Sequence, residues 1–586
     1  MAELQQTAPR VFEIPVEYQP DGGALLDHLA KCGFLGASGA DTAGTEINTG
    51  GSAGNAAAAS AGPVLPQAVL LESADVVSKA HLTTIAVLDS ALTLSCDGDL
   101  VTATAQPDAD GRAQLQHLCD ELPHALRERC ELAATFELPS LREEDADEGR
   151  RLSHRATMEP LRVLADAEVD HPHLPLLAGV VAFDYLATME ELPVVAAGAN
   201  TCPDYLFYSA RVILVVDHES QTANLVGASL DDVALQAKLR ALAAAIDACP
   251  PAAGSTEPVE NGAETLTASP TVSDADFVQT VRLLQENIAA GDVYQVVPSR
   301  GYQIQCPDPL AAYRHLRLTN PSPYMFYIGT PDFQLFGASP ESSLLHCART
   351  GRVSIRPIAG TRPRGFDPEG GIDTELDTRL ELELRSDAKE VAEHVMLVDL
   401  ARNDVARVAK AGTRRVDVLL RVDRYSRVMH LVSEVSGQLR ADLHPLDAFR
   451  ASMTMGTLTG APKLEAAGLI RQAEGQRRGS YGGAVGYLRG DGELDTCIVI
   501  RSAFVRGGRA LVQAGAGVVS ASLPANEAAE TRHKASAVLS SIAAAQGARL
   551  VIAAAPAACP DHGEGAGVTP GGAAANEDGT PTKRGN

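Results

Sequence analysis

The chain has 586 residues, 45% of them hydrophobic, and is therefore long enough for two or more domains with large cores. Its formal net charge of -26 argues against nucleic acid and anionic membrane surfaces as partners, because both would repel it. No apolar run has the length of a membrane span, and the N-terminus lacks the basic and apolar regions of a secretory signal.

The ten cysteines are scattered along the chain, and no two of them form a CxxC pair. This pattern is typical of reduced, mostly buried thiols, and it favours neither a disulfide framework nor a zinc site. We therefore expect a cytoplasmic protein.

Three glycine-rich, small and polar segments interrupt the hydrophobic patterning. We interpret residues 36–66 as a flexible low-complexity insertion, 250–272 as a linker and 547–586 as a disordered tail. The remaining parts are an N-terminal segment, an N-terminal domain and a C-terminal domain, at 1–35, 67–249 and 273–546.

The C-terminal domain begins with a clear helix signal. Ser273 can cap the helix, Gly291 can end it, and apolar residues recur between them at helical spacing, namely Phe277, Val281, Leu284 and Ile288. Strand-like runs follow at 293–298, 496–501 and 510–513. Short strands with intervening helices but no regular βαβ alternation predict an α+β fold, with largely antiparallel sheets packed face to face and flanked by helices.

Two helical patterns each carry a pair of carboxylates. Glu390 and Glu393 are three residues apart, as are Glu527 and Glu530, so each pair shares one helix face. If the four groups converge, a cation must neutralise them, and carboxylate oxygens suit Mg²⁺. Taken alone, each pair is more often a solvated face, and Lys534 beside Glu530 is more often an intrahelical ion pair.

Four other features are weak signals when they are considered singly. The glycines of 513–517 (QAGAG) let backbone N–H groups approach an anion, although a simple turn explains them equally well. Tyr481 lies in a glycine-rich loop, and Arg501, on the strand after residue 496, can pair with a carboxylate. His430 lies in a strand-like run, where a histidine is more often a core residue than a catalyst.

The order of these motifs is more informative than any one of them. They are 202–205 (CPDY), 337–342 (GASPES), 357–365 (PIAGTRPRG), 387–404 (DAKEVAEHVMLVDLARND), 455–463 (MGTLTGAPK), 479–487 (GSYGGAVGY) and 513–517. From Leu70 to about Ala545 the chain resembles the chorismate-utilising enzymes, and within them component I of anthranilate synthase. The resemblance implies that family's α+β fold, a regulatory domain at 67–249 and a chorismate-binding catalytic domain at 273–546.

Two positions narrow the choice within the family. Isochorismate and salicylate synthases use a lysine base to activate water, whereas the matching position here is Gln295, which cannot abstract a proton. Aminodeoxychorismate synthases typically carry a nucleophilic lysine where this chain has Ala359. Both differences favour anthranilate synthase, in which ammonia attacks the ring.

The resemblance implies a lyase that converts chorismate and ammonia to anthranilate and pyruvate, at the first committed step of tryptophan biosynthesis. It implies that Mg²⁺ is bound by Glu393 and Glu530, with Glu390 and Glu527 acting directly or through waters. Glu341 is implied as the acid and His430 as a helper of pyruvate elimination. The implied substrate-binding residues are Gly360, Thr361, Thr457, Tyr481, Arg501, Gly515, Ala516, Gly517 and Lys534.

The resemblance also implies a partner and an inhibitor. No cysteine stands in the GxCxG context of a glutamine amidotransferase, so a separate subunit would deliver ammonia, in a two-plus-two heterotetramer. The implied L-tryptophan site comprises Leu71, Glu72, Ser73, Pro323, Tyr324 and Met325. Enterobacterial members have a lysine ten residues after the serine, where this chain has Thr83, which leaves the strength of inhibition open.

Two alternatives remain at this point. One is an aminodeoxychorismate or aminodeoxyisochorismate synthase component, which its product would distinguish. The other is a catalytically silent partner that only activates an amidotransferase.

Overall fold

This computed structural model describes residues 8–35, 65–74, 82–139, 151–152, 154, 156–251, 264–425 and 428–554. Nearly all of the predicted insertion and most of the predicted tail, at 36–64 and 555–586, lie outside these residues. None of the described helices combines the length and the apolar character needed to cross a membrane.

Helices and strands alternate irregularly along the chain. Up to residue 251 the elements are β1 (Arg10–Val16), α1 (Gly22–Lys31), β2 (Ala68–Glu72), β3 (Thr83–Asp97), β4 (Leu100–Ala105), α2 (Ala109–Glu121), β5 (Leu126–Arg129), β6 (Ala133–Glu137), α4 (Glu159–Ala165), β7 (Leu176–Val181), η1 (Phe183–Thr188), β8 (Tyr205–Asp217), β9 (Thr222–Ser229) and α5 (Asp232–Asp247). From residue 264 to residue 408 they are β10 (Thr265–Pro270), α6 (Asp274–Ala290), β11 (Gln295–Val296), β12 (Ser299–Gln305), α7 (Pro309–Thr319), β13 (Tyr324–Gly329), β14 (Gln334–Ser339), β15 (Ser342–Cys347), β16 (Arg352–Ile355), β17 (Ile358–Pro363), α8 (Thr374–Ser386) and α9 (Ala388–Val408). The last are β18 (Arg415–Arg424), β19 (Val428–Gln438), α10 (Pro445–Ser452), β20 (Gly460–Ala461), α11 (Lys463–Glu474), β21 (Ala484–Arg489), β22 (Leu494–Ile498), β23 (Ser502–Arg506), β24 (Arg509–Gly515), α12 (Pro524–Ala544) and β25 (Arg549–Ile552).

The strands form two sheets that are joined where β3 pairs with β8. From this junction one sheet runs through β2, β13, β14, β23, β24 and β12, and the other through β7, β21, β22, β15, β16 and β19. Apart from β10 with β25, the pairings between the named strands are antiparallel. This confirms the predicted α+β class.

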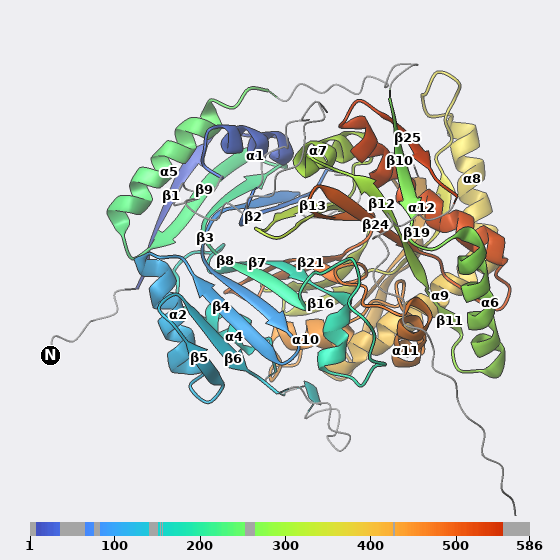
Figure 1. Ribbon diagram of the computed structural model, residues 1–586, viewed down its shortest axis with the longest axis horizontal. Helices are drawn as coiled ribbons and strands as arrows, with labels where there is room; N and C mark the ends of the chain where they lie inside the picture. Colours follow the sequence, from blue (N-terminus) through green and yellow to red (C-terminus); the bar gives the residue numbers. More distant parts are fainter. Residues whose placement is uncertain are drawn as a thin grey trace, which may run out of the picture.

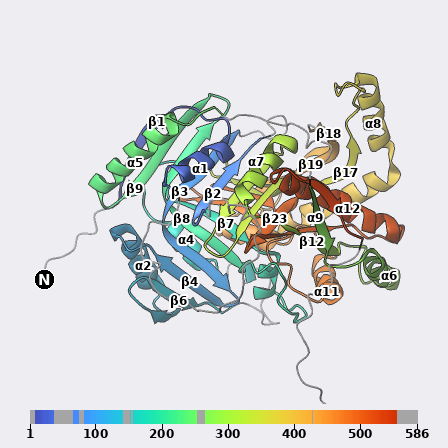
Figure 2. The same cartoon turned by 45° about the horizontal axis from the view of Figure 1, so that its top comes forward.

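Apolar side chains fill three layers. One core cluster lies between the two sheets, with residues from β2, β3, β7, β8, β13 and β21. A second cluster packs the first sheet against α1, α5, α7 and α12, and a third packs the other sheet against α2, α4, α9 and α10. The result is two facing sheets with helices outside both, and α6, α8, α9, α11 and α12 gather at one end (Figures 1 and 2).

The two predicted domains are not physically separate. Strand β2 of the N-terminal domain pairs with β13 of the C-terminal domain, and β7 pairs with β21 in the same way. The N-terminal segment also joins the fold, because β1 pairs with β9. The expected domain boundaries therefore divide the sequence but do not separate two structural units in space.

Two segments predicted to lack structure contain strands. Within the predicted linker, β10 pairs in parallel with β25, which lies at the start of the predicted tail. Each strand is short, so the composition of the longer segment around it does not indicate a strand. Each is stabilised by pairing with a strand that is distant in sequence. The linker and tail boundaries are corrected accordingly.

Local signals were more reliable for helices than for strands. The helix predicted between Ser273 and Gly291 is confirmed as α6, with Ser273 as its N-cap and Gly291 in the left-handed conformation at its end. The strand predicted at 293–298 is only the two-residue β11. Arg501, which we expected on a strand, lies between β22 and β23 with a φ of 49°.

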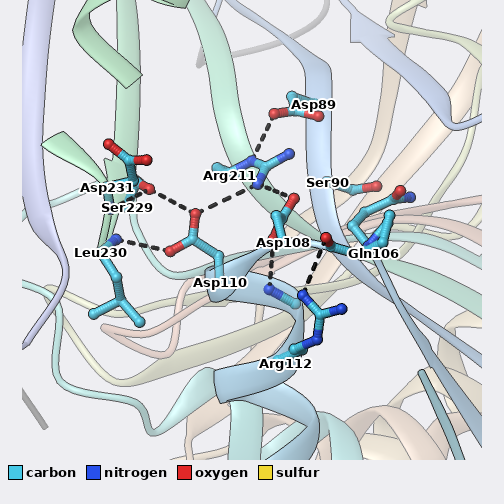
Figure 3. A network of polar contacts seen from close by, with 12 residues as sticks. Asp89, Ser90, Gln106, Asp108, Asp110, Arg112, Arg211, Ser229, Leu230 and Asp231 are labelled. Carbon is cyan, nitrogen blue, oxygen red and sulfur yellow. Dashed lines mark hydrogen bonds and ion pairs between the residues drawn. The ribbon is translucent and has the colours of Figure 1, made fainter. Parts of the chain in front are cut away.

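A network centred on Arg211 connects β8 to β3, α2 and β9 far from the C-terminal helices (Figure 3). Its guanidinium pairs with Asp89 at 2.6 Å and also with Asp108 and Asp110. Asp110 in turn accepts hydrogen bonds from Ser229 Oγ and the N–H of Leu230. These charge-assisted contacts hold the edge of the N-terminal domain together.

Candidate active site

A cavity of about 560 Å³ lies at the end of the molecule where α9 and α12 meet the sheets. Its volume is in the range of small-molecule sites. The predicted residues that line it are Glu341, Gly360, Thr361, Glu390, Glu393, His430, Thr457, Tyr481, Arg501, Gly515, Gly517, Glu527, Glu530 and Lys534. Segments separated by up to almost 200 residues in sequence thus supply one site.

Ala516 is the predicted substrate-binding residue that does not line the cavity. Its side chain is fully buried, and its N–H donates a hydrogen bond to the carbonyl of Pro298 at 3.1 Å. Because that donor is already engaged by the protein backbone, Ala516 does not present it to a ligand. Of the three residues predicted to bind an anion through their backbone, Gly515 and Gly517 line the cavity.

One wall of the cavity is acidic. Burial raises the pKa of Glu393, and the neighbouring carboxylates Glu390 and Glu530 raise it further. Burial also raises the pKa of Glu527, to which Glu530 contributes. Glu530 itself has a lowered pKa, because Lys534 and the hydrogen bond shared with Glu527 outweigh its burial. Glu393 thus interacts with Glu390 and Glu530, and Glu530 also interacts with Glu527.

Basic side chains partly neutralise this wall. Lys534 Nζ lies 2.7 Å from Glu530 Oε1 and 3.1 Å from the carbonyl oxygen of Gly515, so the predicted ion pair exists and faces the cavity. Arg362 Nη1 donates to Glu390 Oε1 at 3.2 Å, and Lys389 also lines the cavity. Four acidic side chains therefore face two lysines and one arginine here.

The acidic wall fits a hard cation in the chemistry of its donors. Carboxylate oxygens are the ligands that Mg²⁺ prefers, and Mg²⁺ needs only one or two of them beside waters and a substrate anion. Within the part of the chain that the structure describes, no three His, Cys, Asp or Glu residues are close enough to form a metal-binding group. The four carboxylates thus share a cavity without converging on one point.

The cavity also contains an unpaired cation. Arg501 is a cavity-lining residue whose guanidinium makes no ion pair or hydrogen bond with the described residues. Burial lowers its pKa, the expected effect on a desolvated positive charge. Its left-handed backbone costs about 1 kcal/mol for a residue with a Cβ. A strained, desolvated and unpaired cation in a cavity is suited to bind an anion.

Tyr481 lies beside this cation, on the loop that precedes β21. Its hydroxyl is 3.0 Å from the position that a Cβ on Gly515 would occupy, so a larger residue at 515 would displace it. Burial raises the pKa of Tyr481 to about 12, and the phenol therefore remains a hydrogen-bond donor. Arg478, fully buried, packs against the Tyr481 ring at 5.6 Å and fixes its position.

Glu341 follows β14 and is buried. Burial raises its pKa to about 8, although interactions with Thr457, the Ile358 N–H and Lys534 oppose the shift. A carboxyl group with this pKa is mostly protonated at neutral pH and can donate a proton. The structure thus gives Glu341 the protonation state that a general acid would need.

His430 lies on β19 opposite Thr361 of β17. Burial and the nearby Arg501 lower its pKa to about 4, so the ring is neutral near pH 7. Its Nδ1 lies 2.9 Å from Thr361 Oγ1 and 3.3 Å from the carbonyl oxygen of Gly360, which can only accept. The proton is therefore assigned to Nδ1, and Nε2 remains available as a base.

Two glycines allow close approach at the acidic wall. Gly360 has a φ of 78°, and a Cβ there would lie 3.2 Å from Glu390 Oε2. A Cβ on Gly517 would lie 2.7 Å from Gln295 Nε2, which donates to Glu393 Oε1 at 3.2 Å. Gln295 therefore orients a carboxylate and offers no base, as its amide chemistry predicted.

The residues of the predicted inhibitor site are also adjacent in space. Glu72 of β2 pairs with Met325 of β13, and Ser73 Oγ donates to the carbonyl of Pro323 at 2.9 Å. Of the predicted inhibitor-site residues, Leu71, Glu72, Tyr324 and Met325 line a cavity of about 50 Å³, and Ser73 and Pro323 do not. A cavity of this size has room for water only, so an amino acid would have to open it.

Glu72, one of the predicted inhibitor-site residues, already has several partners within the protein. Its buried carboxylate accepts hydrogen bonds from Tyr313 Oη at 2.5 Å, from Arg317 Nε at 2.8 Å and from the N–H of Gly22 at 3.2 Å. These contacts connect β2 to α7 and α1. Glu72 is thus held by the protein, which leaves little capacity for a ligand's ammonium group.

A family model described as chorismate binding enzyme matches residues 123–540, which is more than half of the chain. The chain is a chorismate-binding enzyme.

Similar proteins include named members of one branch. The chain is 50% identical over 489 residues to anthranilate synthase component 1 of Vibrio parahaemolyticus, covering 81% of this chain and 88% of that protein. It is 46% identical over 498 residues to the protein of the same name from Escherichia coli, covering 83% and 93%. The crystal structure of anthranilate synthase component I from Streptococcus pneumoniae superposes with a TM-score of 0.60 at 28% identity, covering 78% and 92%.

The structure of this chorismate-binding enzyme adds lining residues that sequence reasoning missed. Lys389 and Gln513 line the large cavity, and both lie inside quoted motifs, so their polar character was a usable signal. Tyr487, Asp495 and Cys497 line the small cavity. The sequence around these three residues gives no sign that they lie near residues 71–73. The two segments are connected only through the strand pairings of β7, β8, β3 and β2.

Proposed function

We propose that this chorismate-binding enzyme is the large subunit of anthranilate synthase, a lyase that converts chorismate and ammonia to anthranilate and pyruvate. It would act at the first committed step of tryptophan biosynthesis. The observation that carries the proposal is one cavity lined by an unpaired guanidinium, four carboxylates and two lysines. Such a site suits a small ring compound with two carboxylates.

The two carboxylates of chorismate would bind to different groups of this cavity. Arg501 and Tyr481 would take the enolpyruvyl carboxylate, because an unpaired cation and a phenol donor lie together there. The ring carboxylate would lie near Gly515, Gly517 and Lys534 at the acidic wall. Gly360, Thr361 and Thr457 would line the space between them.

The acidic wall requires an added positive charge before it can accept a carboxylate. Glu393 and Glu530 would hold Mg²⁺, with Glu390 and Glu527 acting directly or through waters, and the bound ion would supply that charge. The raised pKa values of Glu393 and Glu527 support this proposal, because they report carboxylates that lack full compensation.

In the first stage, ammonia adds to ring carbon C2 while the hydroxyl on C4 leaves. Glu341 would protonate that hydroxyl, because its pKa of about 8 keeps the acid form present near neutrality. Ammonia brings its own lone pair, so no base is needed, in agreement with an amide at Gln295.

In the second stage, the ring loses the proton on C2 and the enolpyruvyl group on C3, and becomes aromatic. His430 would accept this proton at Nε2, since its other nitrogen is engaged by Thr361 and Gly360. The released enolpyruvate takes up a proton to become pyruvate. The low pKa of His430, about 4, keeps the base form available at neutral pH.

Ammonia would come from a separate glutamine amidotransferase subunit, in a two-plus-two heterotetramer. No cysteine of the chain stands in a GxCxG context, so the chain has no evident means of releasing ammonia from glutamine. A cytoplasmic location belongs to the same proposal. The nine cysteines among the described residues are free thiols, as expected in a reducing compartment.

Tryptophan would inhibit the enzyme at the small cavity lined by Leu71, Glu72, Tyr324 and Met325, next to the Ser73–Pro323 hydrogen bond. The strands that line this cavity lead directly to the large one, because β22 carries Asp495 and is followed by Arg501. Opening the small cavity would therefore disturb the residues that bind substrate.

The decisive experiment is incubation of the full chain with chorismate, an ammonium salt and Mg²⁺. The expected result is a fluorescent product whose mass is that of anthranilate. A product with the mass of an aminodeoxychorismate, or no product at all under conditions where a known anthranilate synthase reacts, would refute the proposal.

A further inference from the structure

Gln513 is a cavity-lining residue to which neither the sequence predictions nor the mechanism above gives a role. It lies on β24 two residues before Gly515, so both residues are on the same face of the strand. The pairing of β24 with β23 matches Phe504 with Leu511, and the same register continued by two residues places Gln513 opposite Ser502. Gln513 is therefore close in the sheet to Arg501.

The carbonyl end of the Gln513 side chain is bound inside the protein. Asn200, from the N-terminal domain, donates from Nδ2 to Gln513 Oε1 at 2.9 Å and to Ser480 Oγ at 2.9 Å. Asn200 is only 4% exposed, and its connection to Ser480 ties it to the residue before Tyr481.

The orientation of the Asn200 amide is not arbitrary. Its Oδ1 accepts from the backbone N–H of Cys202 and of Ser480, each at 3.3 Å, and a backbone N–H can only donate. The other end of the Asn200 amide must therefore be the NH₂ group. It follows that Gln513 presents its oxygen to Asn200 and keeps its own NH₂ group on the side of the cavity.

That NH₂ group has no acceptor within the described part of the chain, because Gln513 Nε2 makes no hydrogen bond there. A fixed donor beside an unpaired guanidinium and a phenol donor forms a third contact for the same anion. A carboxylate has two oxygens with about four acceptor sites, which is enough for all three donors.

We propose that Gln513 is a further substrate-binding residue, which donates a hydrogen bond from Nε2 to the enolpyruvyl carboxylate. Asn200 is then a positioning residue that fixes the direction of the Gln513 amide. This inference rests on the proposed function, since it takes chorismate as the ligand. It also gives the N-terminal domain a direct part in building the catalytic site.

The test is steady-state kinetics of the full chain with saturating ammonium and Mg²⁺. Gln513→Met keeps the side-chain length but removes the donor, and the KM for chorismate should rise about 10- to 100-fold, as expected for a lost hydrogen bond to a charged group. Gln513→Glu should raise it further, because a carboxylate would face a carboxylate. Gln305→Glu, on the exposed part of neighbouring β12, adds the same charge and should leave the KM unchanged.

Asn200→Asp tests the positioning role. An Asp oxygen cannot donate, so the Gln513 amide should turn and present its oxygen to the substrate. The KM should therefore rise, although residue 200 itself does not touch the substrate. If Asn200 acts through Gln513, the double variant Asn200→Asp with Gln513→Met should have nearly the KM of Gln513→Met alone. If the role of Asn200 is purely structural, Asn200→Asp should raise the KM by the same factor in both backgrounds. Full additivity of the two changes would overturn the positioning role.

The outcomes separate this inference from the proposed function. If the wild-type chain forms anthranilate but both Gln513 variants have a KM within about fivefold of wild type, the effect expected of a neutral contact, the inference is wrong and the function stands. If the wild-type chain forms no anthranilate, both fall. A thermal scan of each variant identifies unfolding, and Gln513→Met and Gln513→Glu provide independent readings if one is unstable.

Discussion

Thr361 and His430 are cross-strand neighbours whose Oγ1 and Nδ1 atoms lie 2.9 Å apart. The carbonyl of Gly360 lies 3.3 Å from the same nitrogen, so the ring is protonated there and its Nε2 is the basic atom. The sequence places a threonine and a histidine 69 residues apart. The antiparallel register of β17 and β19 makes one the orienting group of the other, in the manner of the third member of a catalytic triad.

His430→Ala should let an aminated, non-aromatic intermediate accumulate, because the base for the C2 proton is removed. Anthranilate fluorescence should appear about 10²- to 10⁴-fold more slowly, the usual contribution of a general base, while chorismate is still consumed. Mass analysis of quenched reactions measures the intermediate. His124→Ala, at an exposed position before β5, is the control, and a wild-type rate in His430→Ala would remove His430 from the mechanism.

Glu341 should produce an alkaline limb in the pH profile. Its pKa is raised to about 8, so the acid form predominates below pH 8, and kcat should fall about tenfold per pH unit above it. Glu341→Gln cannot donate a proton in this way and should be about 10²- to 10⁴-fold slower, with that limb absent. An unchanged limb in Glu341→Gln would assign it to another group.

Glu530→Gln should weaken the response to Mg²⁺. Loss of a residue that only supports a metal ligand typically weakens metal binding roughly 10- to 100-fold. Because Glu530 would be a ligand itself, the Mg²⁺ concentration for half-maximal activity should rise by at least this factor. The measurement is a Mg²⁺ titration of the rate at fixed chorismate. Glu286→Gln, on the exposed face of α6, removes the same charge elsewhere, and a Glu530→Gln titration that matches it would refute the ligand assignment.

The pure chain should form anthranilate with ammonium salts but not with glutamine. The physical reason is that hydrolysis of the glutamine amide needs an activated cysteine nucleophile, and no GxCxG segment is present. Adding a glutamine amidotransferase subunit should restore the reaction with glutamine. Turnover of glutamine by the pure chain would contradict the proposed division of labour.

Tryptophan should bind to the full chain and inhibit it, and Thr83→Lys should strengthen the inhibition. Thr83 lines the small cavity, so a lysine at this position would bring an ammonium group to the carboxylate of a bound amino acid. Isothermal titration and inhibition curves measure both effects. No heat at millimolar tryptophan in either protein would mean that the cavity does not take this ligand.

Local features that depend on neighbouring residues could be predicted from the amino-acid sequence. The helix between Ser273 and Gly291 followed from a cap, a hydrophobic period and a terminal glycine, which act over a few residues. The paired carboxylates of α9 and α12 were visible for the same reason, since i,i+3 spacing fixes their shared faces. Motif order then indicated which distant segments belong to one site.

Tertiary structure alone decided how these features act together. Whether Glu341 is an acid depends on burial, and burial depends on strands β14, β15 and β22 that are distant in sequence. The strands at 265–270 and 549–552 exist because each pairs with the other, which composition cannot reveal. Asn200 reaches Gln513 across 313 residues, and Glu72 is occupied by Tyr313 and Arg317. The protonation state and the hydrogen bonds of a side chain depend on the residues around it in space. Only the tertiary structure determines which residues these are.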